Sequence, residues 1–282
     1  MKRWGQVAMP RGDGSRVGVV RAVTLAWTRV WAIAVNTFRE AIRNKVLYGI
    51  AFFAIGMIFF SVVLGTLSVH EEKKLITDIG FSAVSFFGVI MAIFIGVNLV
   101  YKEIDRKTIY AIIPKPIERY QFMVGKFLGV VMTLFAQTVL LSIFLFLFLA
   151  LYGAPLTGTT FAAIYLIFLA IIVMTAVALF FSSFSTPYLS GFFSLGIFIL
   201  GSVRAEAIAQ ISKVAKIGTL YDGLQVFASV IPDLTLFNVV GRVQRGDHVP
   251  FLYLVEATGY AVTYAAVLLA LGSFAFNRRD FV

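Results

Sequence analysis

The 282-residue sequence contains no cysteine, and only 13% of its residues are charged. Without cysteine, disulfides, thiol catalysis and thiolate metal sites are excluded. Soluble domains carry about 25% charged residues, whereas this chain is 60% hydrophobic. A soluble globular fold is therefore excluded, and the composition is typical of a protein that crosses a membrane several times.

Uncharged apolar runs recur along the sequence, and most are long enough to cross the roughly 30 Å hydrocarbon core as a helix. Membrane-spanning strands would alternate in segments of about 10 residues, but runs such as 140–151 are apolar on every side. The sequence therefore predicts an all-α integral membrane fold with six transmembrane helices. The predicted spans are Val46–Leu67, Phe81–Val100, Phe127–Leu151, Phe161–Phe184, Leu189–Val203 and Phe251–Phe276.

The basic residues are distributed unevenly between the two sides of the membrane. Seventeen of the 24 Lys and Arg residues lie before the first span, between the second and third, or after the sixth. The positive-inside rule then predicts that the N- and C-termini are both cytoplasmic. This orientation explains the net charge of +10 without any need for nucleic acid as a partner, and it predicts a multi-pass protein of the cytoplasmic (inner) membrane.

The cytoplasmic N-terminal segment 1–45 contains one further helical pattern. Residues 22–38 are a weak candidate for an additional span, because Arg29 and Asn36 oppose insertion. Instead, the pattern indicates an interfacial helix, with one apolar face and one polar face. The apolar face is formed by Trp31, Val35, Phe38 and Ile42, and the polar face by Asn36, Arg39, Glu40, Arg43 and Asn44.

The fifth predicted span is the shortest, and the extracytoplasmic segment 204–250 that follows it is too long for a plain loop. Helical spacing predicts two amphipathic helices there, which form an outer hairpin before the sixth span. The fifth span either continues past Arg204 or is shortened by a re-entrant hairpin.

Small residues in two spans suggest close helix packing. Ser190, Ser194 and Gly201 share one face of the fifth span, and Gly125 and Gly129 form a second pair at the start of the third. Each set is a candidate dimer face, although packing within the chain explains the spacing equally well.

The predicted spans offer no catalytic or ion-coupling chemistry. Glu256 is the one ionisable residue in a span, and its place near the outer end favours the membrane interface over a proton path. His70 and His248 belong to no metal-binding pattern. Gly125-Lys126 resembles part of a P-loop, but Phe127 replaces Ser or Thr. We therefore expect no metal, no cofactor and no enzymatic activity.

The cytoplasmic loop 101–126 differs from the rest of the chain, with six basic residues, three acidic residues and two prolines in 26 positions. A short amphipathic helix is predicted from Glu103 to Ile112, ended by Pro114 and Pro116. A second helix is predicted to start at Glu118 and Arg119 and to run into the third span. This shape is suited to docking a partner, whereas a simple topology-fixing loop is the alternative.

Several residues of this loop, together with the preceding 36–43 segment, resemble the permease subunits of type-2 ATP-binding-cassette (ABC) transporters. The group containing the nitrous-oxide-reductase maturation permease and the gliding-motility permeases is the most similar in appearance. The loop positions that match are Glu103, Lys107, Thr108, Pro116, Arg119 and Gly125-Lys126, and those of the connecting helix include Phe38, Arg39, Glu40 and Arg43.

The resemblance implies that residues 1–282 form one permease domain of an ABC exporter, without catalytic residues of its own. Two ATPase subunits would dock on the loop, and a second permease chain, identical or paralogous, would complete the complex among membrane lipids. A nucleotide-independent scaffold or lipid-interacting assembly factor is the alternative, and an ion-coupled carrier is a third. The residues expected to contact or couple to the ATPase are Glu103, Lys107, Thr108, Pro114, Pro116, Arg119 and Lys126.

Overall fold

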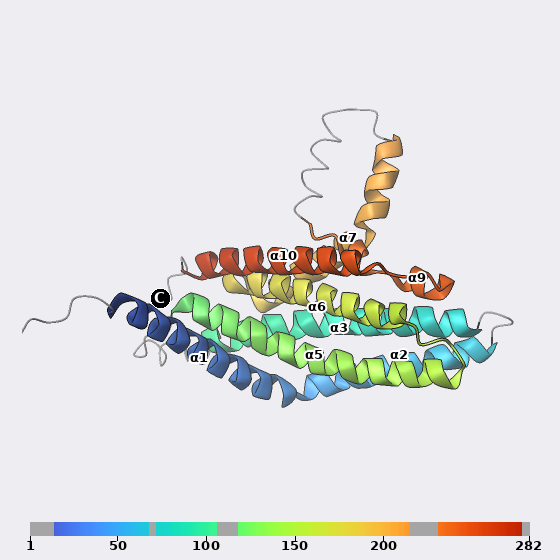
Figure 1. Cartoon of the computed structure of the whole chain (residues 1–282), viewed down its shortest axis with the longest axis horizontal. Coiled ribbons are helices and arrows are strands. Elements are labelled where there is room, and N and C mark those ends of the chain that lie inside the picture. The colour runs from blue at the N-terminus through green and yellow to red at the C-terminus, as the bar shows by residue number, and fades with distance from the viewer. Residues whose placement is uncertain (1–13, 68–71, 106–117, 215–230, 278–282) are drawn as a thin grey trace, which may run out of the picture.

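The computed structural model describes residues 14–67, 72–105, 118–214 and 231–277; at several helix ends only the backbone is described. Within these ranges all regular secondary structure is helical (Figure 1). The elements are α1 (Gly14–Ile42), α2 (Lys45–Leu67), α3 (Glu72–Asp105), α5 (Arg119–Leu151), α6 (Gly158–Phe184), α7 (Pro187–Val214), the 3-10 helix η1 (Leu234–Phe237), α9 (Val240–Arg245) and α10 (Phe251–Asn277).

The prediction of six transmembrane helices is confirmed. Six helices, α2, α3, α5, α6, α7 and α10, are long and apolar enough to span a membrane. Each predicted apolar run lies inside one of them, but α3 starts nine residues before its run and α5 eight residues before. Charged and polar residues at helix ends do not interrupt backbone hydrogen bonding, so a helix can continue beyond the segment that hydropathy detects.

Helix α6 lies at the centre of the bundle and packs on α3, α5, α7 and α10. Of its apolar window, 67% is buried inside the chain, against 17% for α7. Glycines of α3 allow the backbones to approach: a Cβ at Gly88 would lie 2.4 Å from Ile171 Cδ1, and one at Gly96 would lie 2.9 Å from Ala178 Cβ. Close approach of this kind is the main source of helix association in lipid.

Helix α1 is longer than the predicted connecting helix, and it is not among the membrane-spanning candidates. It runs beside the first half of α5 and leads directly into α2 (Figure 1). Its buried face is one residue away from the predicted apolar face, because small side chains rather than large ones meet α5. The buried residues are Val30, Ala34, Thr37 and Ala41, whereas Trp31 is exposed and Val35, Phe38 and Ile42 are half-buried.

Helix α7 continues past Arg204 to Val214, one of the two alternatives that the sequence allows. It leaves the bundle at an angle, and its last turns stand apart from the other helices (Figure 1). The chain from Ile231 returns to the bundle: Arg204 Nη1 donates to Ile231 O at 3.0 Å, and Asp233 N donates to Tyr260 Oη at 2.9 Å. The second predicted amphipathic helix falls mainly within 215–230, outside the described residues, so the outer hairpin remains a prediction.

The α3–α6 contact can be tested at Gly96. Replacing Gly96 with Leu should lower the free energy of unfolding by about 1–3 kcal/mol, because Ala178 Cβ is bonded directly to the α6 backbone and cannot rotate away. Thermal unfolding in detergent would measure the loss. The matched control is Gly56→Leu in α2, where an added Cβ meets nothing within 4 Å; equal destabilisation by the two changes would contradict the packing.

Candidate functional site

The α3–α5 end of the bundle is where α3 ends at Asp105 and α5 begins at Arg119. The intervening 106–117 segment contains most of the predicted docking residues. The prediction that a helix starts at Glu118 and Arg119 and runs into the third span is confirmed, since Glu118 is the N-cap of α5. Helix α1 packs along this same part of α5, so three helical segments converge beside the loop.

Two glycines of α5 set the contact with α1. A Cβ at Gly125 would lie 2.7 Å from Ile33 Cβ and 3.0 Å from Val30 O. At Gly129 it would lie 2.6 Å from the backbone oxygen of Ala34. Backbone atoms cannot move aside as a flexible side chain can, so no larger residue fits without separating the helices. Packing within the chain, the alternative to a dimer face for this glycine pair, therefore accounts for its spacing.

Lys126 lies between these glycines, and its side chain is only 2% exposed. Its Nζ is 3.9 Å from Glu40 Oε2 and 5.6 Å from the centroid of the Phe122 ring. Burial of an ammonium group is costly unless an opposite charge or polar groups compensate it. The Lys126–Glu40 pair thus adds an electrostatic contact to the steric one. We call the contact formed by Ala34, Thr37, Glu40, Gly125, Lys126 and Gly129 the α1–α5 junction.

A buried polar stripe continues along α5 from the junction into the bundle. Thr133 Oγ1 donates to Gly129 O at 2.9 Å, and Ser142 Oγ donates to Thr138 O at 2.7 Å. Gln137 is 6% exposed, and its Nε2 has no hydrogen-bond partner among the described residues. A buried amide without a partner costs about 1–3 kcal/mol. Sequence reasoning that looked for charged residues within spans missed this stripe, because its amide and hydroxyl groups are uncharged. The signal that could have found it is Gln137, a polar residue within an apolar run.

The predicted docking residues lie in different parts of this end. Glu103 is in the last turn of α3 and Arg119 in the first of α5, where only the backbone is described. Lys107, Thr108, Pro114 and Pro116 are outside the described residues. On α1, Arg39 is exposed, Phe38 is half-buried and Glu40 is 43% exposed, and Arg43, directly after α1, is exposed. Lys126 is buried, so any effect it has on a docked partner would act through the α1–α5 junction.

The candidate dimer face on α7 is turned into the chain. Ser190 and Ser194 are fully buried, and Ser194 Oγ donates to Ser190 O at 2.7 Å. A Cβ at Gly201 would lie 2.7 Å from Pro232 O. Packing within the chain, the alternative that the sequence allowed, accounts for these three residues. In contrast, Tyr188, Phe192 and Ile199 of the same helix are 92%, 71% and 60% exposed.

Among the described residues, no three His, Asp or Glu side chains are grouped closely enough to hold a metal ion. Glu256 is exposed on α10, five residues after the helix begins.

The sequence profile described as ABC-2 family transporter protein matches residues 31–281. The chain belongs to this family. No curated protein matches the chain. The matched region starts at Trp31, inside α1, so Ile33, Ala34 and Thr37, which lie against Gly125 and Gly129, fall within it. The chain is thus a multi-pass ABC-2 permease, the membrane component of an ABC transporter.

The Lys126–Glu40 pair of the α1–α5 junction can be tested by a double-mutant cycle. Glu40→Gln and Lys126→Met should be non-additive by about 0.5–1 kcal/mol in the free energy of unfolding, because each change removes the same contact. The expected coupling is small, since Glu40 is 43% exposed and water screens the pair. Unfolding in mixed detergent micelles would measure it. In the control cycle, Glu118→Gln replaces Glu40→Gln and should be additive with Lys126→Met. Additivity of Glu40→Gln with Lys126→Met would refute the contact.

Proposed function

We propose that this ABC-2 permease couples ATP hydrolysis by a separate ATPase subunit to export, or to mechanical work, across the cytoplasmic (inner) membrane. Two ATPase subunits dock on the loop between α3 and α5, and a second permease chain completes the complex. The observation that carries the proposal is the α1–α5 junction. There, α5, which follows the loop, packs closely on α1, which precedes the first span.

The contacts provide a continuous mechanical route from the loop into the membrane. A displacement of Arg119 moves the first turns of α5, and Gly125 and Gly129 hold α1 too closely for it to stay behind. Helix α1 is separated from α2 only at Arg43 and Asn44. Asn44 Oδ1 accepts a hydrogen bond from Val46 N at 3.1 Å, so the break is a short, capped turn. Movement of the loop is therefore transmitted to α2.

A separate ATPase subunit would also supply the energy that transport requires. An ATPase that binds two permease conformations with different affinity shifts their populations by that difference in binding free energy. The Gln137 amide, which has no partner among the described residues, lies on the α5 face that leads away from the junction. A second arrangement of α5 in which this amide gains a partner would recover part of the cost of burying it.

The proposed second permease chain has an apolar surface available on α7. This helix is the least buried of the six candidate spans, with 17% of its window inside the chain. Its exposed face includes Tyr188, Phe192 and Ile199. Pairing through this face would place the tilted α7 between the two bundles, while the small residues Ser190 and Ser194 remain packed against their own chain.

Docking on the loop can be tested by the charge swap Glu103→Lys with Arg119→Glu, which keeps the net charge. We expect at least tenfold less ATPase to copurify with the permease and a loss of ATP-dependent transport, with membrane insertion unchanged. Quantitative blotting of the purified complex and of membrane fractions would measure both.

The control swap is Arg245→Asp with Asp247→Arg, an exposed ion pair of 2.8 Å at the opposite end of the bundle. Copurification should be normal in this control. Normal ATPase copurification and stimulation in the Glu103 and Arg119 swap would overturn the docking proposal and favour the nucleotide-independent scaffold.

Pairing through α7 can be tested by cross-linking, because the chain has no cysteine of its own. Phe192→Cys should give a dimer with a short bismaleimide in native membranes, and the buried Ser194→Cys should not. Phe52→Cys on α2 is the control, since Phe52 is 73% exposed and apolar but lies outside the proposed face. Equal dimer yields at positions 52 and 192 would show random collision and contradict the α7 pairing.

A further inference from the structure

A recess of about 620 Å³ lies at the end of the bundle opposite the loop, between the first turns of α3, the connection from α5 to α6, and α9. Its size falls in the range of sites for small molecules, about 300–1,000 Å³. The walls combine apolar side chains with three basic residues, Lys73, Lys74 and Arg245, and one acidic residue, Glu72. The lining residues that matter most are Lys73, Leu149, Pro155, Val243, Gln244 and Arg245.

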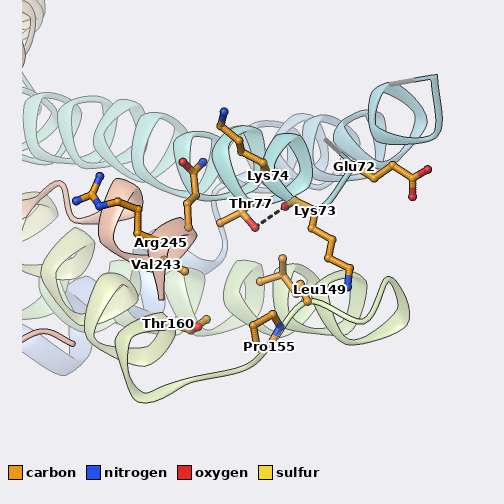
Figure 2. Close-up of a pocket in the computed structure, with 11 residues that line it drawn as sticks. Glu72, Lys73, Lys74, Thr77, Leu149, Pro155, Thr160, Val243 and Arg245 are labelled. Carbon is orange, nitrogen blue, oxygen red and sulfur yellow. Dashed lines mark hydrogen bonds between the residues drawn. The ribbon is translucent and has the colours of Figure 1, made fainter. Parts of the chain in front are cut away.

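Lys73 supplies a positive charge to this recess. Its side chain extends toward Leu149 and Pro155, whereas its neighbours Glu72 and Lys74 point in other directions (Figure 2). The Nζ lies 3.8 Å from where a Cβ would stand on Gly153, so it reaches the turn after α5. Among the described residues, no carboxylate lies within 4.0 Å of this ammonium. A ligand's negative charge would therefore meet an uncompensated positive one.

Most other polar groups around the recess already have a hydrogen-bond or ion-pair partner within the chain. Arg245 Nε pairs with Asp247 at 2.8 Å, and Thr77 Oγ1 donates to Lys73 O at 2.7 Å. In contrast, Gln244 Nε2 is buried with no hydrogen-bond partner among the described residues. Because Gln244 Nε2 is buried, the Lys73 ammonium is the donor that an anionic group in the recess can reach.

Apolar surface lies beside this ammonium. Leu149 is only 2% exposed and supplies little of it, so most comes from Ala154, Pro155 and Val243. Leu151, the last residue of α5, is 68% exposed. A free inorganic anion would leave this apolar surface in contact with water, whereas an anion attached to a hydrocarbon chain would cover it.

From this combination we propose that the recess binds the phosphate headgroup of an anionic phospholipid. The phosphate accepts hydrogen bonds from the Lys73 ammonium, and the acyl chains lie along the apolar end of α5. Membrane lipid is the source favoured over free phosphate because the ammonium and the apolar wall are adjacent. The site is separate from the α1–α5 junction and does not depend on ATPase coupling.

Binding to the purified full-length permease in detergent tests the proposal. The probes are dioctanoyl phosphatidylglycerol, dioctanoyl phosphatidylcholine and inorganic phosphate, and thermophoresis measures the dissociation constants. Phosphatidylglycerol should bind more tightly than the other two. Lys73→Gln should weaken it about tenfold, which corresponds to the loss of one charge-assisted hydrogen bond, and Lys73→Arg should restore most of the affinity.

Arg242→Gln is the matched control, because it removes one positive charge from α9 at the same end of the bundle, but Arg242 stacks on the Tyr253 ring at 5.0 Å and does not line the recess. It should change the affinity less than twofold. Equal weakening by Lys73→Gln and Arg242→Gln would show general electrostatic attraction to this surface and contradict a specific site. Equal affinity for phosphatidylcholine would remove the headgroup specificity, and phosphate binding as tightly as phosphatidylglycerol would exclude a lipid as the preferred ligand.

Discussion

Close approach of helix backbones is the constraint on which this structure depends. Lipid chains are as apolar as leucine, so the hydrophobic effect does not drive helices together within the membrane. Contact area and short separations must do so, and glycine provides both. On α3, Gly80, Gly88 and Gly96 recur every eight residues and meet side chains of α5 and α6. On α5, Gly125 and Gly129 meet α1. These two sets hold the centre of the bundle and its α3–α5 end.

The sequence predicts the spans well because membrane insertion depends on local properties. An apolar run of sufficient length is a helix in lipid whatever its neighbours are, and all six predicted runs lie within such helices. The start of α5 at Arg119 was predictable for a related reason, since Pro114 and Pro116 end any preceding helix. The family resemblance rests on the same loop and agrees with the match over 31–281.

Helix partners and helix faces could not be predicted in the same way. The sequence predicted an interfacial helix with Trp31 and Phe38 on its apolar face, but it did not predict the face that packs on α5, which contains Ala34, Thr37 and Ala41. Shape complementarity to Gly125 and Gly129 decides this contact, and hydrophobicity does not report shape. The recess at the opposite end was also invisible, because Lys73 and Gln244 are about 170 positions apart in sequence and only the fold brings them together.

The length of α5 has a consequence for how far its first residues stand from the lipid. Its 33 residues extend about 50 Å at 1.5 Å per residue, and the hydrocarbon core takes up about 30 Å of that length. The predicted span Phe127–Leu151 leaves the first eight residues of α5, about 12 Å, as a lever arm on the α3–α5 side. A tilt of about 10° at the membrane surface would move the tip of such an arm by roughly 2 Å. A small change in the tilt of α5 within the bilayer would therefore accompany a displacement of a few ångströms at Arg119.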